Sequence, residues 1–143
     1  MTKDLDELVY PRIGDLCKLG DELAEKGDFA NALGKYVEAL SLVPDPVLDW
    51  EASTWILTAI GDVYFHVGDY RQSRAALEHA MRAPNAIGNP FIHLRLGQVQ
   101  FELGEMERAR DELARAYMGA GDEIFAEEDP KYLDLIRSLM RQG

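Results

Sequence analysis

The sequence has few of the residues that form covalent cross-links and metal sites. A single cysteine, Cys17, leaves no second thiol for an internal disulfide and fits a reducing compartment such as the cytosol. The three histidines, His66, His79 and His93, stand at no spacing typical of metal ligands. No stretch approaches the ~20 apolar residues that a membrane-spanning helix needs. The chain does not open on a basic segment followed by an apolar one, so we expect a cytoplasmic protein without a secretory signal.

Motifs that carry catalysis or bind phosphate are also missing. The sequence has no glycine-rich phosphate loop, no nucleophile elbow and no serine, histidine and aspartate arrangement. The acidic run within residues 122–129 lacks the alternating acids and the glycine of a calcium loop. A solvated surface explains this run most simply, and a docking patch for a basic partner is the alternative. We therefore predict a protein that is not an enzyme and that uses no cofactor or metal.

Positive charge is scarce. The chain has 15 lysines and arginines against 26 aspartates and glutamates, a net charge of −11, and the acidic excess extends along its whole length. Such a charge disfavours binding to nucleic acid or to an anionic membrane, because both are negative themselves. It favours a basic protein partner by speeding the encounter. Acidic charge also keeps a protein soluble, and charge alone does not separate these two roles.

Helical periodicity dominates what is present. The 143 residues are 47% hydrophobic, as expected for one folded domain, here residues 1–143, or one short array of repeats. Apolar residues at spacings of three and four predict pairs of helices, each pair joined by a Gly-Asp or Gly-Glu turn. We expect these pairs at about residues 13–46, 54–87 and 90–121, with a last helix at about 131–141. One pair cannot bury its own apolar side, so each pair needs neighbours.

The three pairs share a pattern of small residues. A glycine recurs in the first helix and a small residue recurs near the start of the second, at Gly20 and Ala32, Gly61 and Ser73, and Gly97 and Ala109. Small residues at these places let two helices approach closely. The pattern resembles the 34-residue tetratricopeptide repeat, W-x2-L-G-x2-Y…A-x3-F…P. The resemblance implies an all-α fold, an α-solenoid of three helical hairpins with a C-terminal capping helix.

The linker between the first two pairs is longer than this period allows. We expect the extra residues to lengthen the next helix at its N-terminus, with Asp49 as a possible cap. Trp50 lies in the same linker. It could protrude as an anchor for a partner, but we expect it to pack on the first pair.

A second resemblance covers residues 50–132. The segment is similar to small bacterial tetratricopeptide proteins through the words TWILTAIGDVYF, AIGNPFIHLRLGQ, DELARAYMGAGDEIF and EEDPKY. Members of that group are often described as immunity proteins of polymorphic toxin systems, which bind a toxin domain in their own cytoplasm and block it. The resemblance implies a toxin-neutralising protein with a basic toxin domain as its partner. The alternative is a tetratricopeptide adaptor, or a scaffold like a secretion chaperone, that binds a basic peptide or protein.

In tetratricopeptide arrays the first helices of the hairpins line a concave groove. Carried over to this chain, the resemblance implies a groove that mixes aromatic anchors with acids, as a basic segment would require. The predicted partner-binding residues are Asp21, Glu25, Trp55, Thr58, Asp62, Phe65, His66, Gln98, Phe101 and Glu102. Trp55 and Asp62 are the first candidates. Phe65 and Phe101 fit burial between repeats equally well, and Phe91 fits burial better.

One known groove chemistry does not fit. Co-chaperones of this repeat family clamp a C-terminal carboxylate with lysine and asparagine, but here those places hold Cys17, Asp21, Thr58 and Asp62. The charge is wrong for a carboxylate, so we do not expect binding of that kind. The groove, the convex side and the segment 119–130 all stay open as binding surfaces, and the oligomeric state stays open as well.

Overall fold

The computed structural model describes residues 9–142, and side chains within them as far as residue 138. This part of the chain consists of α-helices and 3-10 helices joined by turns and linkers. The α-helices are α1 (Val9–Glu25), α2 (Phe29–Ser41), α3 (Glu51–His66), α4 (Tyr70–Met81), α5 (Pro90–Glu102), α6 (Met106–Ala120) and α7 (Pro130–Gln142). The 3-10 helices are η1 (Val47–Asp49) and η2 (Gly121–Phe125). The predicted all-α architecture is confirmed.

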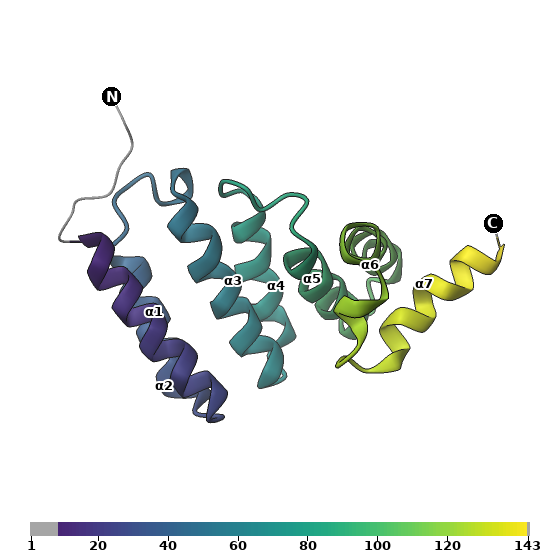
Figure 1. Cartoon of the computed structure of the whole chain (residues 1–143), viewed down its shortest axis with the longest axis horizontal. Helices are drawn as coiled ribbons and strands as arrows, with labels where there is room; N and C mark the ends of the chain where they lie inside the picture. The colour runs from purple at the N-terminus through teal and green to yellow at the C-terminus, as the bar shows by residue number, and fades with distance from the viewer. Residues whose placement is uncertain (1–8, 143) are drawn as a thin grey trace.

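The helices fold back on one another in pairs. α1 packs with α2, α3 with α4 and α5 with α6, and the pairs stack through α2 against α3 and through α4 against α5. Figure 1 shows the pairs side by side in chain order, with the first pair at one end and α7 at the other. α3 also contacts α5, so the first helices of neighbouring pairs share one side of the array. None of the helices described is long and apolar enough to span a bilayer.

Each pair turns on a glycine in the left-handed region. These glycines, with φ of +80°, +82° and +82°, are Gly27, Gly68 and Gly104. The residue after the glycine is the N-cap of the second helix: the carboxylates of Asp28 and Asp69 accept from the amides three residues on, at 3.4 and 3.2 Å. Glu105 stands at the same place in the third turn but makes no cap. It forms an ion pair with Arg74 of α4 instead, which ties the second hairpin to the third.

A close approach of two helices defines each hairpin. The recurrent glycine of the first helix lies against a large, buried side chain of the second: Gly20 against Tyr36, Gly61 against Leu77 and Gly97 against Leu113. A Cβ atom added to these glycines would come within 2.6, 2.6 and 2.7 Å of the nearest side-chain atom. No carbon atom tolerates such distances, so only glycine allows this spacing of the helices.

The linker between the first two hairpins differs in part from its prediction. α3 begins at Glu51 with Trp50 as the capping residue, whereas Asp49 belongs to η1. The prediction that Asp49 caps this helix is therefore wrong. Trp50 packs against the core of the first hairpin, as predicted, and its indole N–H donates to the carbonyl of Pro44 at 2.9 Å.

The last helix covers the open end of the third hairpin. Phe125 of η2, with Tyr132 and Ile136 of α7, is buried against Leu94 and Leu113 of that hairpin. At the start of α7 the carboxylate of Asp129 accepts from the amide of Lys131 at 3.0 Å. The apolar end of the array is therefore covered by the chain itself.

The glycine contacts yield a test of stability. We expect Gly97→Ala to lower the free energy of unfolding by about 1–3 kcal/mol, because its Cβ would overlap the buried Leu113. Urea titration followed by circular dichroism measures the change. The matched control is Gly34→Ala in α2, where a Cβ meets no atom within 4 Å. This control should stabilise the protein by roughly 0.5–1 kcal/mol through helix propensity alone. Equal stability of the two variants would contradict this account of the packing.

Candidate partner-binding face

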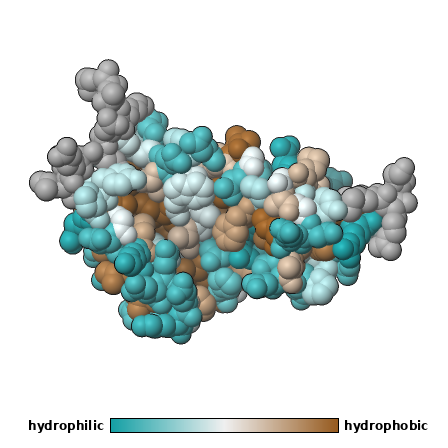
Figure 2. All heavy atoms as spheres, in the orientation of Figure 1, coloured by the Kyte–Doolittle hydropathy of each residue, from teal (hydrophilic) through white to brown (hydrophobic). Residues whose placement is uncertain are grey.

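One side of the array is lined by α1, α3 and α5, and we name it the first-helix face. In Figure 1 this face turns toward the viewer, with α1 in front of α2. All ten residues predicted to contact a partner lie on these three helices. Figure 2 shows the same face, where apolar side chains gather in a hollow between α1 and α3.

That hollow is a small apolar pocket, which we name the α1–α3 pocket. It has a volume of about 150 Å³ and is lined by Tyr10, Ile13, Gly14, Cys17, Ala52, Trp55 and Ile56. Trp55, predicted as a contact residue, is 46% exposed. Gly14 leaves the wall open on the α1 side, because a Cβ built there meets no atom within 4 Å.

Two carboxylates follow the pocket along α1. Asp21 accepts a hydrogen bond from the hydroxyl of Tyr36 at 2.5 Å. Its charge also reaches the pocket: burial, and then the neighbouring Asp21, raise the pKa of the Cys17 thiol. Burial and the hydrogen bond to Asp21 raise the pKa of Tyr36 in the same way. Glu25 is exposed and, within the part of the chain that the structure describes, has no ion-pair partner.

The middle of the first-helix face is organised around a buried cation that the sequence analysis did not single out. Arg95 of α5 is only 5% exposed. Its Nε lies 2.8 Å from Oδ1 of Asp62 in α3, and its Nη1 lies 2.7 Å from Oε1 of Glu128. Gln98 joins the same network: it accepts from Arg95 at 2.7 Å and donates to Glu128 at 2.6 Å. One guanidinium thus connects the second hairpin, the third hairpin and the segment before α7.

Aromatic rings enclose this cation. The guanidinium carbon of Arg95 lies 4.5 Å from the ring centroid of Phe65 and 5.0 Å from that of Phe91. His66 stacks on Phe29 with ring centroids 5.6 Å apart and lies 3.3 Å from Asp62. Phe65 therefore sits half-buried between the hairpins, the alternative that the sequence had left open.

The end of the face next to α7 is closed by internal pairs. The Nζ of Lys131 lies 2.6 Å from the carboxylate of Glu102, which also accepts from the hydroxyl of Tyr132 at 3.2 Å. Phe101 packs edge-on against Tyr132, with ring centroids 5.2 Å apart. Glu102 and Phe101, both predicted partner contacts, are thus engaged by the chain itself.

Two predicted contact residues are inaccessible. Thr58 is 5% exposed and its hydroxyl donates to the carbonyl of Thr54 at 2.6 Å. Gln98 is fully buried in the Arg95 network. The expectation that these side chains point into an open groove is wrong, because the close stacking of α3 and α5 covers them.

Charge divides the first-helix face into two ends. The carboxylates of Asp62, Glu102 and Glu128 are paired with Arg95 and Lys131, two cations for three acids. Among the predicted contact residues in the described part of the chain, the acids without an ion-pair partner are therefore those of the α1 end, Asp21 and Glu25. The sequence contains a signal for the pairing of Arg95. It is the lone arginine in the apolar stretch PFIHLRLGQVQF, and a buried arginine needs a carboxylate partner.

The histidines and acids form no metal site in the described part of the chain: no group of three or more His, Cys, Asp or Glu residues there could hold an ion. His93 is buried, with its Nδ1 2.6 Å from Glu112 and its Nε2 accepting from the amide of Gly88 at 2.9 Å. It therefore ties the linker before α5 to α6.

Comparison with known proteins identifies the repeat. The family model described as tetratricopeptide repeat matches residues 58–123, which span the second and third hairpins. The chain contains tetratricopeptide repeats. No curated protein matches the sequence.

Solved structures share the tetratricopeptide fold over nearly the whole chain. The C-terminal domain of a putative FK506-binding protein from Plasmodium falciparum is 16% identical, with a TM-score of 0.73 and coverage of 98% of this chain and 93% of that one. The type III secretion chaperone SycD of Yersinia enterocolitica, in complex with a peptide of the translocator YopD, is 15% identical, with a TM-score of 0.72 and coverage of 96% and 98%. The first repeat domain of Spaghetti (RPAP3), bound to an HSP90 peptide, is 14% identical, with a TM-score of 0.68 and coverage of 92% and 95%. These likenesses show a tetratricopeptide solenoid.

The Arg95 network makes a quantitative prediction. We expect Arg95→Met to lower the free energy of unfolding by about 2–3 kcal/mol, because Asp62 and Glu128 would keep their charges but lose the guanidinium that pairs with both. This is less than the ~3–5 kcal/mol found for fully buried pairs, since both carboxylates retain some contact with water. Lys131→Met removes the more exposed pair with Glu102 and should lower the free energy of unfolding clearly less than Arg95→Met does, because solvent screens an exposed pair. If chemical denaturation showed that both variants lower the free energy of unfolding equally, Arg95 would not stabilise the fold more than an exposed ion pair does.

The cysteine offers a pH-dependent measurement. Because burial and Asp21 raise its pKa, Cys17 should hold less thiolate at pH 8 than a free cysteine does and react more slowly with iodoacetamide. The rate should rise as the pH passes above the ordinary thiol range. Asp21→Asn removes one of the two causes, so it should speed alkylation at pH 8, while Asp15→Asn should not. An unchanged rate in the Asp21 variant would remove Asp21 from this explanation.

Proposed function

We propose that this chain is a protein-interaction module that holds a segment of a basic partner protein on its first-helix face. The proposal rests on one observation: an open apolar pocket lies beside two carboxylates, Asp21 and Glu25. Neither carboxylate has an ion-pair partner within the described part of the chain. Apolar anchors provide affinity when they are buried, and neighbouring charges select the partner and speed its arrival. The proposal is one of binding and not of catalysis.

Proteins of the same fold give this proposal support. SycD is described in complex with a peptide of a translocator, and the Spaghetti domain in complex with the HSP90 peptide SRMEEVD. The latter peptide ends in acidic residues and a carboxylate. In this chain the accessible charges at the α1 end, Asp21 and Glu25, are negative, which favours a basic segment instead.

Neutralisation of a toxin domain in the cytoplasm is the first candidate for the biological role. It rests on the resemblance of residues 50–132 to small bacterial repeat proteins described as immunity proteins, and on the acidic charge. A role as an adaptor or a chaperone of secretion is the second candidate. It rests on the likeness to SycD, which extends over 96% of this chain.

Identification of the partner separates the two roles. The tagged chain is purified from its native host after cross-linking, and the partner is identified by mass spectrometry. For the first role we expect a protein whose isolated domain stops growth unless this chain is co-expressed. For the second we expect a secreted protein that needs the chain for stability or export and is harmless alone. A partner that fits neither description would reject both roles.

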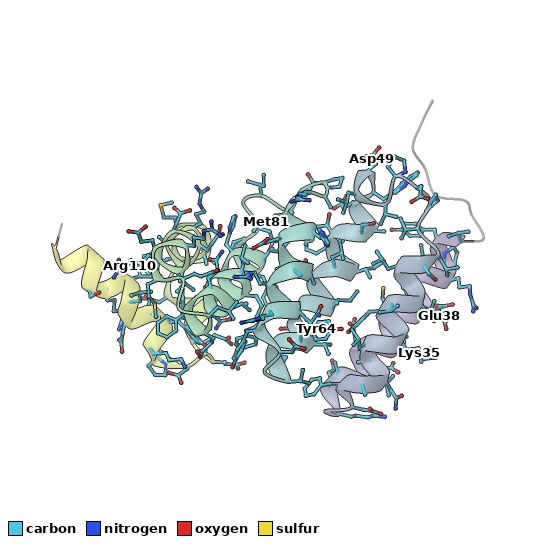
Figure 3. The ribbon with its side chains drawn as sticks, turned by 180° about the vertical axis from the view of Figure 1, so that it is seen from behind. Lys35, Glu38, Asp49, Tyr64, Met81 and Arg110 are labelled. Atoms are coloured by element: carbon cyan, nitrogen blue, oxygen red, sulfur yellow. The ribbon has the colours of Figure 1, made fainter. Side chains whose placement is uncertain are left out.

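The binding surface is tested with the same partner. Glu25→Lys on the α1 end should slow association several-fold, because a rim charge acts mainly on the encounter. The control is Glu38→Lys on α2, whose exposed pair with Arg12 at 3.8 Å contributes little. Figure 3 labels Glu38 on the reverse of the molecule, near Lys35. Surface plasmon resonance measures both rates. A larger effect of the Glu38 variant would place the interface on the other side of the array and overturn the proposal.

A further inference from the structure

The α1–α3 pocket has a chemistry that specifies part of its ligand. We infer that it is an anchor site for one side chain of leucine or phenylalanine size, with a lysine or arginine next to that anchor in the bound segment. This inference rests on the proposed function and adds to it the place of the anchor and the chemistry of the residues that fill it.

The size of the pocket sets the anchor. Its volume of about 150 Å³ equals that of apolar cavities that take up a benzene-sized molecule. The lining is hydrocarbon for the most part, from Ile13, Ala52, Ile56 and the ring of Trp55, with the half-buried thiol of Cys17. A leucine side chain or a phenyl ring matches this space, whereas a charged group would lose its hydration there.

Two residues keep the pocket open. Gly14 carries no side chain, and any side chain at this place would extend into free space. Trp55 forms the opposite wall and remains 46% exposed, although an indole of this size gains from being covered. An exposed tryptophan at the edge of an apolar hollow is the arrangement that binding hot spots use, because the partner completes the burial of the ring.

The acidic residues beside the pocket favour a basic residue next to the anchor in the bound segment. Asp21 lies one helical turn beyond Cys17 on the same side of α1, and Glu25 lies one turn further. Burial, and then Asp21, raise the pKa of the Cys17 thiol, which lines the pocket. A cation adjacent to the anchor would meet these carboxylates, whereas the acids at the other end of the face are already paired with Arg95 and Lys131.

The same charge argues against a second copy of this chain as the occupant. Each copy carries a net charge of −11, so two copies would bring like charges together at the acidic α1 end. A segment with a positive charge has no such penalty. The occupant is therefore a basic segment of another protein.

A peptide selection tests the inference. A phage-displayed library of random nonapeptides is selected in parallel on the wild-type chain, on Gly14→Leu and on Gly34→Leu. The first variant is chosen to fill the pocket, because Gly14 lines it and a Cβ there meets no atom within 4 Å. The second makes the same change at a glycine of α2 that is equally free of neighbours and lies away from the pocket. Thermal unfolding confirms that each variant is folded.

The test compares the peptide sequences in the three selected pools. We expect the wild-type and Gly34→Leu pools to be enriched in leucine or phenylalanine next to lysine or arginine, and the Gly14→Leu pool to lose the apolar residue. Replacing the anchor by alanine in a selected peptide should weaken its binding by about tenfold or more. Basic peptides without an apolar anchor, selected equally by all three proteins, would overturn the anchor site and leave the proposed function standing. No enrichment in any pool would overturn both.

Occupancy of the pocket has a direct reporter. Cys17 lines it and is the only cysteine of the chain. A selected peptide should slow alkylation of Cys17 at saturation, and its alanine version should not do so at the same concentration. Alkylation that slows with rising protein concentration, without peptide, would instead assign the pocket to a second copy and overturn the inference. Binding without any protection of Cys17 would also overturn it.

Discussion

The contact between a helical glycine and the large side chain of the next helix sets the geometry of each hairpin. At Gly20, Gly61 and Gly97 the two helices lie so close that even one added carbon would overlap a buried ring or isobutyl group. In the second hairpin the hydroxyl of Ser73 uses this proximity and donates to the carbonyl of Gly61 at 2.6 Å. Because the spacing within each hairpin is fixed, the first helices stand in one row. The pocket between α1 and α3 and the network between α3 and α5 both occupy gaps of that row.

Local signals account for the part of the fold that could be predicted. Helical periodicity, the Gly-Asp turns and the small residues of the repeat act within about 20 residues of one another, so a single sequence shows them. The prediction of a cap at Asp49 was wrong because Asp49 belongs to η1, so that Trp50 is the capping residue before α3. On the candidate site, the repeat pattern placed Trp55, Asp21 and Glu25 on the first helices of their hairpins, and the structure has all three exposed there. It could not show that Arg95 would pair with Asp62, which lies 33 positions earlier, and with Glu128, which lies 33 positions later. Burial of Thr58 and Gln98 has the same non-local origin.

The first-helix face is therefore asymmetric in a way that a repeat pattern does not suggest. At the end near α7 the chain supplies its own cations and rings, so Glu102, Phe101 and Phe65 make contacts within the molecule. At the α1 end Trp55 stays half exposed, and the carboxylates of Asp21 and Glu25 face no cation in the described structure. Equivalent positions of one repeat family thus serve stability in one hairpin and remain available for recognition in another. The division arises from two cations, Arg95 of α5 and Lys131 of α7.

Ionic strength acts differently on these two ends. Exposed charges are screened over about 8 Å at physiological salt, whereas the guanidinium of Arg95, 5% exposed, is largely shielded from mobile ions by its rings. Added salt would then weaken the attraction that Asp21 and Glu25 exert on an approaching cation while it leaves the folded array almost unchanged. The attraction of a cation and the stability of the fold are thus separated by the depth at which each set of charges lies.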